Sequence, residues 1–277
     1  MFDSRCNGGL TMLCLGKQHG SNFKTKHFMA RQEGVIKIKG QMGGISFYKS
    51  QDGLMARQKG GIDSERIKND PAFARTRENG AEFGRAGVSG KLLRTALRSL
   101  IMNVSDNRMI SRLTQAMMKV VQSDLNNLRG ERNAGDGDVT LLTGFEFNQN
   151  AKLDKTFFAP YTPTIDRATG ALSIDIPDFV PGEQVVTPSG TTHYRLISGG
   201  ARVDFKTGEY ESDSSESGYL SIAGLQQPAL TLTQNVTSGA PGSLILAFGI
   251  TFYQEVNGHM YPLRNGAFNA LSVVRVN

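Results

Sequence analysis

The sequence predicts an α+β protein, in which an N-terminal β-meander with an antiparallel helix pair is followed by a C-terminal antiparallel β-sandwich. Three observations support this fold class. Short alternating runs joined by Gly-rich turns precede residue 61, two amphipathic stretches lie between residues 71 and 125, and strand-like runs recur beyond residue 140. The chain has 277 residues, of which 39% are hydrophobic and 20% charged, so it is long enough to bury a sizeable core.

The net charge of +6 conceals a difference between the two halves of the chain. Residues 1–133 contain 23 Lys and Arg against 11 Asp and Glu, a net charge of +12, whereas residues 134–277 contain 8 against 14, a net charge of −6. The turn-rich segment 128–140, LRGERNAGDGDVT, lies where the composition changes. We therefore expect a basic domain at residues 29–130 and an acidic domain at residues 134–277.

Residues 1–28 show neither helical nor strand periodicity, and Met29 then opens a strand-forming segment, MARQEGVIKIKG. We expect residues 1–28 to be a doubtful leader or a wrongly assigned start, with Met29 as the true start. A secretory signal is the competing interpretation, because Arg5 precedes the short apolar stretch 10–15, although no A-x-A cleavage site follows. The cytoplasm is the default compartment, and the sequence leaves later release or surface assembly open.

The meander is expected as three short strands before Gly61. They lie at residues 35–39, 45–49 and 54–57. In the first, Ile36 and Ile38 alternate with lysines, which is typical of a half-buried strand. The turn after it is expected at residues 40–44, and Asp52-Gly53 is a hairpin signal.

A helix is predicted to begin at Asp70-Pro71, because Asp70 can cap the free amides and Pro71 needs no donor in the first turn. Gly84, Gly87 and Gly90 predict that this helix ends or kinks between residues 84 and 90. Gly80 and Gly84 lie four residues apart on one face, and we expect this face to pack tightly against the meander.

Two further helices are predicted, one at residues 89–103 and one after Ser105-Asp106 that runs to Leu125. The short connection favours an antiparallel pair. The first carries an apolar stripe of Leu92, Leu93, Ala96, Leu97, Leu100 and Ile101. The second is expected to bury its apolar side chains, which are Met109, Ile110, Leu113, Met117, Val120, Val121 and Leu125.

Strand-like runs separated by turns fill the second half, without a helical pattern. They lie at residues 140–142, 145–147, 173–176, 194–197, 203–205, 220–222, 230–232, 244–253, 260–263 and 270–276. Regular short strands of this kind predict the antiparallel β-sandwich.

Several classes of protein are excluded by what the sequence lacks. No run approaches the eighteen apolar residues of a membrane span, and two cysteines, Cys6 and Cys14, cannot form a disulfide scaffold. The segment 84–91, GRAGVSGK, departs from a phosphate-binding loop, because Arg85 stands where Gly is required and Leu92 follows Lys91.

Catalytic and metal-binding patterns are also missing. No G-x-S-x-G elbow occurs, and His193 and His259 have no partner at zinc-ligand spacing. Asp136-Gly137-Asp138 lacks the remaining positions of a calcium loop. The acidic residues around Lys206-Thr207-Gly208 are interpreted as a solubilising hairpin tip. We expect no enzymatic activity, no cofactor and no metal.

The basic half supplies the candidate binding residues, because nucleic-acid binding requires cations gathered on one face. The candidates for an anionic partner are Lys37, Lys39, Lys49, Arg57, Lys59, Lys91, Arg94 and Arg98. Phe47 and Tyr48 lie among the first of them, although aromatic residues in a strand are more often part of a core than a stacking platform.

Three stretches of the chain resemble a family of Bacteroidota proteins. They are IKIKGQMGGISFYKSQDGLMARQKGG, NDPAFARTRENGAEFGRAGVSGKLLRTALRSL and GITFYQEVNGHMYPLRNGAFNALSVVRV. The resemblance implies a start near Met29. It implies no activity, cofactor or functional residue.

The leading hypothesis is a non-enzymatic structural or interaction protein, a self-associating subunit of a filament, surface or phage-derived assembly. Oppositely charged halves can attract head to tail between copies. The alternative is a nonspecific nucleic-acid-binding protein that uses residues 35–130. Ligand binding by the sandwich has only fold-level analogy behind it.

Overall fold

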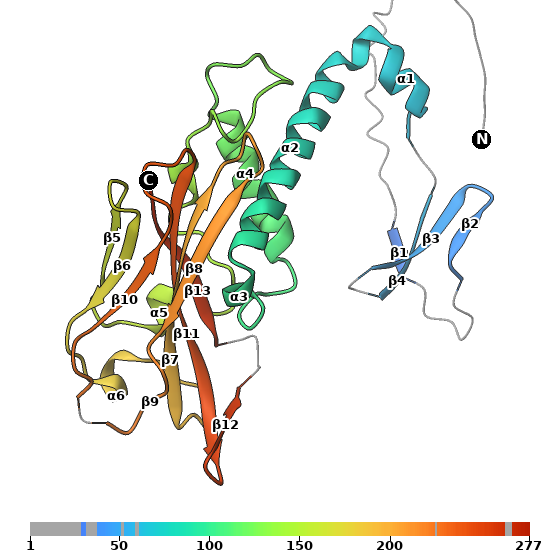
Figure 1. Cartoon of the computed structure of the whole chain (residues 1–277). Helices are drawn as coiled ribbons and strands as arrows, with labels where there is room; N and C mark the ends of the chain where they lie inside the picture. Colours follow the sequence, from blue (N-terminus) through green and yellow to red (C-terminus); the bar gives the residue numbers. More distant parts are fainter. Residues whose placement is uncertain (1–28, 32–37, 51–52, 59–60, 225, 264–267) are drawn as a thin grey trace, which may run out of the picture. The chain divides into compact units, whose positions relative to one another are not determined.

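The structure is a computed structural model that describes residues 29–31, 38–50, 53–58, 61–224, 226–263 and 268–277 (Figure 1). It divides into two compact units, the first ending at Ser64 and the second comprising Glu65–Asn277. The expected mixture of helices and antiparallel strands is confirmed. The expected leader at residues 1–28 lies outside the described residues.

The first unit contains a four-stranded antiparallel sheet with the order β1-β4-β3-β2. The strands are β1 (Met29–Arg31), β2 (Gly40–Met42), β3 (Ile45–Ser50) and β4 (Gly53–Gln58). The strands predicted at residues 45–49 and 54–57 are therefore confirmed.

The predicted turn at residues 40–44 is wrong, because its first three residues form β2. Met42 pairs with Ile45, so only Gly43 and Gly44 make the turn, and Gly43 has a φ of 56° that favours glycine. Of the strand predicted at residues 35–39, residues 35–37 lie outside the described residues, and Ile38 and Lys39 precede β2 without strand structure.

Five helical segments follow in the first part of the second unit. They are α1 (Ser64–Asn69), the 3-10 helix η1 (Pro71–Phe73), α2 (Ala74–Ala96), α3 (Arg98–Ile101) and α4 (Met109–Gln122). The predicted start is confirmed, because the Asp70 carboxylate accepts a 2.9 Å hydrogen bond from the Ala72 amide and Pro71 occupies the first position.

The predicted break between Gly84 and Gly90 is wrong, since α2 runs unbroken for 23 residues. Ala86, Ser89 and Leu93 are buried along its inner face and hold these turns in place. Tertiary packing therefore outweighs the low helix propensity of glycine. The helix predicted at residues 89–103 is the end of α2 followed, after Leu97, by α3.

The apolar stripe predicted for α2 and α3 is confirmed, because its members from Leu93 to Ile101 are buried and Leu92 is partly buried against the same cluster. In α4 the prediction is wrong for two residues, since Ile110 is 53% exposed and Leu125 is 94% exposed. Leu125 follows the last helical residue, Gln122, so the helical repeat no longer fixes its direction.

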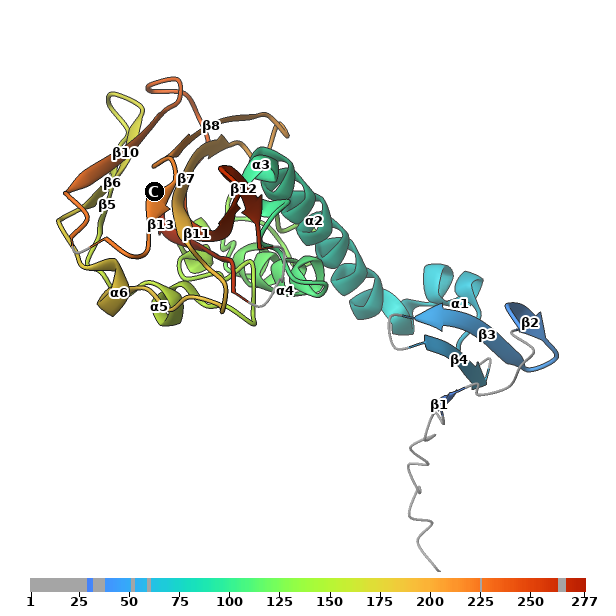
Figure 2. The same cartoon turned by 90° about the horizontal axis from the view of Figure 1, so that it is seen from below.

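Two antiparallel sheets complete the second unit. The smaller has the order β10-β6-β5 and consists of β5 (Thr162–Asp166), β6 (Ala171–Ile176) and β10 (Leu230–Asn235). The larger, which curls around the core in Figure 2, consists of β7 (His193–Val203), β8 (Tyr210–Glu216), β9 (Leu220–Ser221), β11 (Ser243–Val256), β12 (His259–Pro262) and β13 (Ala270–Val276).

Three short helical turns lie among the strands. They are η2 (Val139–Leu142), α5 (Leu153–Thr156) and α6 (Pro181–Gln184). The strand predicted at residues 140–142 is therefore wrong, because Asp138 caps η2 by accepting a 3.0 Å hydrogen bond from the Thr140 amide. The strand predicted at residues 145–147 forms only an isolated bridge, between Glu146 and Ser272.

Side chains alternate across the larger sheet, so that it borders two hydrophobic cores. Along β11, Ile245 and Ala247 belong to the core shared with α2 and α4, whereas Leu246 and Phe248 belong to the core shared with the smaller sheet. Gly199 in β7 allows close approach of α3, because a Cβ atom there would lie 2.3 Å from Leu100 Cδ1.

The segment 128–140, where we expected a domain boundary, lies within the second unit and is bound to α2. The Gly130 amide donates to the Glu82 carboxylate at 2.8 Å, and Arg132 forms an ion pair with Glu82 at 3.3 Å. The compact units divide at Ser64 instead. No helix among the described residues has the length and apolar character needed to cross a membrane.

Candidate functional site

The surface of α2 opposite the core carries glycines at helical spacing. Gly80 and Gly84 are exposed and Gly87 is partly exposed. A Cβ atom added to any of these three would find no described atom within 4 Å. We call Gly80, Gly84 and Gly87 the glycine face. The expected packing of Gly80 and Gly84 on the meander concerns a contact between the two units and stays a prediction.

The glycine face is unfavourable for an isolated helix. Glycine at an exposed helix position costs about 1 kcal/mol relative to alanine, so the three positions together cost about 3 kcal/mol. The described part of the second unit contains no packing contact that requires them, since an added Cβ atom would meet open space. Glycines on a helix surface permit the backbone of another element to approach closely.

Two large apolar side chains flank the glycine face. Phe83 is 60% exposed and Val88 is 70% exposed, and both belong to α2. Their spacing places them on either side of the glycines. Exposed glycines bordered by apolar side chains form a helix surface onto which another helix can pack.

The opposite side of α2 is fixed by contacts within the chain. Glu82 is 1% exposed and binds the Gly130 amide and Arg132, as described above. Arg85 donates from Nε to the Arg132 carbonyl at 2.7 Å and from Nη2 to the Gly130 carbonyl. These contacts set the rotation of α2, so the glycine face is held outward.

The predicted basic residues on α2 and α3 continue the glycine face toward its C-terminal end. Lys91 and Arg98 are exposed and Arg94 is partly exposed, at helical spacing after Gly87. Among the described residues, these three side chains form neither hydrogen bonds nor ion pairs. We call Lys91, Arg94 and Arg98 the cation stripe.

The remaining predicted basic residues belong to the first unit. Lys39 and Lys49 are exposed, and the Arg57 guanidinium lies 5.4 Å from the centroid of the Tyr48 ring. Lys37 and Lys59 lie outside the described residues. Of the predicted set, the three members of the cation stripe therefore form a surface within one unit.

The acidic residues of the second unit are largely engaged within the chain. Glu211 accepts a 3.0 Å hydrogen bond from the Thr237 amide, which lowers the pKa of its carboxyl group, and Asp213 accepts one of 2.9 Å from the Asn235 amide. Glu216 forms an ion pair with Arg195. These contacts leave the net charge of the two halves unchanged, so head-to-tail attraction between copies stays a prediction.

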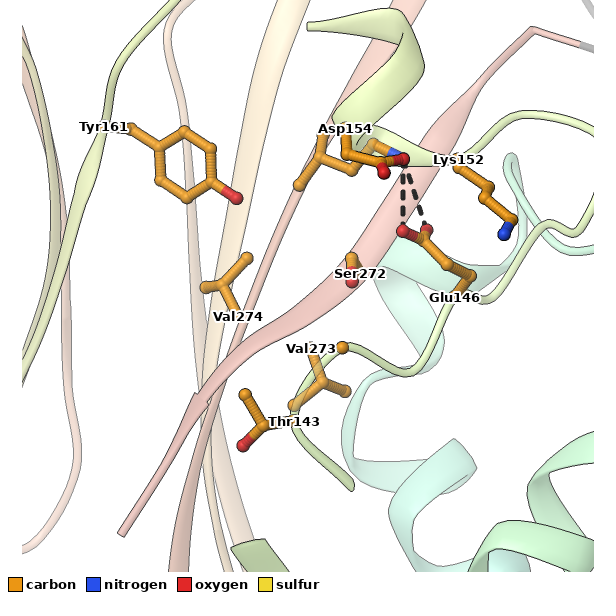
Figure 3. Close-up of a pocket in the computed structure, with 10 residues that line it drawn as sticks. Thr143, Glu146, Lys152, Asp154, Tyr161, Ser272, Val273 and Val274 are labelled. Atoms are coloured by element: carbon orange, nitrogen blue, oxygen red, sulfur yellow. Dashed lines mark hydrogen bonds between the residues drawn. The ribbon is translucent and has the colours of Figure 1, made fainter. Parts of the chain in front are cut away.

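A second candidate site is a pocket of about 350 Å³ between α5 and β13, shown in Figure 3. Sequence reasoning did not identify it. Its lining combines acidic, basic, hydroxyl and apolar side chains with one glycine. They are Thr143, Gly144, Glu146, Lys152, Leu153, Asp154, Tyr161, Ser272, Val273 and Val274.

Glu146 has the most perturbed carboxyl group of this pocket. Burial, with a smaller contribution from the nearby Asp154 carboxylate, raises its pKa from 4.5 to about 7. The Leu153 amide opposes the shift by donating to both carboxylate oxygens at 3.3 Å. Burial also raises the pKa of Tyr161, to which Glu146 and Asp154 contribute.

Arg112 of α4 holds the backbone around Glu146 in place. Arg112 Nη1 donates to the Glu146 carbonyl at 2.6 Å, and Arg112 Nη2 donates to the Phe147 carbonyl at 3.3 Å. The same guanidinium pairs with Asp106 and lies 5.5 Å from the Phe145 ring centroid. A partly buried hydrogen-bond network therefore holds Glu146 at the pocket.

The chemistry of metal binding is not supported by the described residues, in which no group of three or more His, Cys, Asp or Glu side chains could hold an ion. Comparisons with protein-family models, curated proteins and solved structures found no match for this chain.

Proposed function

We propose that this chain is a non-enzymatic interaction protein that self-associates through the glycine face of α2. The observation that carries the proposal is that Gly80, Gly84 and Gly87 have no described atom beside them, on a helix whose other side is fixed. A second copy of α2 would use the close approach that these glycines permit. It would also bury Phe83 and Val88, whose exposure is 60% and 70%.

An antiparallel contact centred on Gly84 suits both geometry and charge. In such a two-fold arrangement Gly80 of one copy faces Val88 of the other, and the helix dipoles oppose. The two Lys91 residues would then lie about 21 Å apart along the axis, from fourteen residues at 1.5 Å each. This exceeds the screening length of about 8 Å at physiological salt, so the cation stripes repel weakly. A further interface would be needed to extend the dimer into a filament or surface assembly.

We also propose a finer description of the scaffold that presents this face. The two sheets share a core containing Ile174 and Phe248, which supports a β-sandwich. Gly90 of α2 lies next to Leu113 and Met117 of α4, with an added Cβ atom 3.6 Å from Met117, which supports a helix pair.

Sedimentation of the full chain over a dilution series tests the self-association. We expect a concentration-dependent dimer that Gly84→Leu abolishes, because a leucine side chain prevents close approach. Gly182→Leu is the matched control, since Gly182 is also a helical glycine with no described atom within 4 Å of an added Cβ. A wild-type chain that stays monomeric at high concentration, or a Gly84→Leu chain that still dimerises, would reject the proposal.

A second candidate function is nonspecific nucleic-acid binding, favoured by the cation stripe, whose side chains have no hydrogen-bond or ion-pair partner among the described residues. Replacing Lys91, Arg94 and Arg98 together with Ala should reduce the slope of log affinity against log salt by about 3. Fluorescence anisotropy with a labelled duplex measures this slope. Replacing Lys152 and Lys155 with Ala is the control. No binding at low salt, or equal effects of both sets, would exclude this role for the stripe.

A further inference from the structure

We propose that the pocket lined by Glu146 and Asp154 binds a primary ammonium group, carried either by a small alkylamine or by a lysine side chain. The pocket lies between α5 and β13, away from the residues of the glycine face, so this inference is independent of self-association. Figure 3 shows Glu146, Asp154, Ser272 and Tyr161 around one space.

The charges in the pocket favour a cation. Glu146 and Asp154 contribute two carboxyl groups and Lys152 contributes one ammonium group. No ion pair among the described residues joins Lys152 to either carboxylate. With both carboxyl groups ionised the lining carries a net charge of −1, and a bound ammonium group would neutralise it.

The remaining lining favours an alkylammonium over a metal ion or an anion. Leu153 and Val274 supply apolar surface for a hydrocarbon chain, and the Tyr161 ring can face a cation. The Ser272 hydroxyl can donate to the Phe145 carbonyl, at 3.4 Å, or to the Glu146 carboxylate, and its oxygen can accept from an ammonium N–H. Two carboxylates are few for Ca²⁺, which takes six to eight oxygen ligands, and the volume of about 350 Å³ is far larger than one ion.

Binding should be coupled to release of a proton from Glu146. An ammonium group beside this carboxyl favours its ionised form, as Lys152 does weakly, while Asp154 opposes ionisation. From the neighbouring elements, the Tyr161 hydroxyl also faces the pocket, and Arg112 of α4 binds the Glu146 carbonyl and Asp106. Because the pKa is about 7, we expect affinity to rise about tenfold between pH 6 and pH 8.

Isothermal titration of the full chain with cadaverine tests the proposal. We expect binding that strengthens about tenfold from pH 6 to pH 8 and, at pH 7, a heat that depends on the ionisation enthalpy of the buffer. Glu146→Gln should lose the pH dependence and weaken binding at least tenfold. Glu183→Gln removes an exposed carboxylate on α6 and should bind as the wild type does.

Further measurements distinguish the two sources of the ammonium group and control for misfolding. Tighter binding of cadaverine than of Nα-acetyl-lysine amide indicates a free amine, and the reverse indicates a lysine side chain. Asp154→Asn, which changes a surface carboxylate without burying a new group, should weaken cadaverine binding if circular dichroism is unchanged. Equal binding of 1-pentanol, no binding at millimolar cadaverine, or wild-type binding by both Glu146→Gln and Asp154→Asn would overturn the proposal.

Discussion

The segment 123–138 and the outer surface of α2 lie in the same unit but differ in their contacts. The polar groups of the segment are hydrogen-bonded within the chain, whereas the glycines and cations of α2 face outward. Asp124 is 2% exposed and accepts hydrogen bonds from the amides of Asn126, Asn127 and Asn133 at 2.8–3.1 Å. The glycine face and the cation stripe have no comparable partners among the described residues. A feature whose contacts are made within the chain explains the fold, whereas the one without described contacts is the basis for the self-association proposed above.

The largest loss of stability should come from removing the hydrogen bonds that hold the segment 123–138. Asp124→Ala removes the acceptor of three backbone amides, and we expect a loss of about 3 kcal/mol in the free energy of unfolding. Urea unfolding measures it. Glu131→Ala, an exposed acid in the same segment, should change stability by less than about 0.5 kcal/mol. If both variants lose equally little, the Asp124 network does not hold the segment.

The pH dependence of stability should distinguish the buried Asp124 carboxyl group from the partly buried Glu146 carboxyl group. The pKa of Asp124 is lowered from 3.8 to about 2 because its hydrogen bonds outweigh burial, so its contribution is present above pH 4 and lost as the pH falls toward 2. The pKa of Glu146 is raised from 4.5 to about 7, so its contribution is complete below pH 4.5 and lost as the pH rises through 7.

Glu146→Gln isolates the second of these contributions. Relative to the wild type, the free energy of unfolding of the variant should gain on the order of 2 kcal/mol between pH 5 and pH 8, since the wild type alone must ionise a partly buried carboxyl group. Urea unfolding at several pH values measures the difference. A constant difference over this pH range would show that Glu146 is not perturbed. Glu183→Gln provides the exposed control.

Replacing an exposed glycine of α2 with alanine should have the opposite effect on stability to replacing a glycine packed in the core. Gly84→Ala should raise the free energy of unfolding by about 1 kcal/mol, because alanine favours the helix and meets open space. Gly199→Ala should lower it by about 1–3 kcal/mol, because the new Cβ atom would lie 2.3 Å from Leu100 Cδ1. Thermal unfolding at low protein concentration measures both. Destabilisation by Gly84→Ala would mean that this face is already packed.

The smallest effect on stability should come from the cation stripe. Alanine at Lys91, Arg94 or Arg98 should change the free energy of unfolding by less than about 0.5 kcal/mol each, because these side chains have no partner in the described structure. Chemical denaturation of the three single variants measures this. A loss above 1 kcal/mol would reveal a contact within the chain and remove the argument for an outside partner.

Elements formed by local interactions could be predicted from the sequence, whereas features that depend on long-range packing could not. The apolar stripe from Leu93 to Ile101 could be predicted because helical periodicity is local. The continuity of α2 could not, since it depends on packing against α4 and the sheet. β8 was missed because its sequence, YESDSSE, lacks apolar alternation.

The candidate sites differ in the same way. The basic residues of the cation stripe are visible in the sequence at helical spacing, and the structure places them on one exposed surface. The glycines were also visible, but spacing alone does not tell which surface of a helix is covered. The pocket depends on Glu146 and Ser272, which are far apart in the chain and are joined by a bridge that no local pattern signals.

Disulfide formation at position 84 tests the central claim most directly. In a chain carrying Cys6→Ser, Cys14→Ser and Gly84→Cys, a two-fold contact centred on Gly84 brings the two new thiols within bonding reach. We expect rapid formation of a covalent dimer under mild oxidation, with Gly182→Cys in the same background remaining monomeric. Equal cross-linking of both variants, or none at position 84, would contradict self-association through the glycine face.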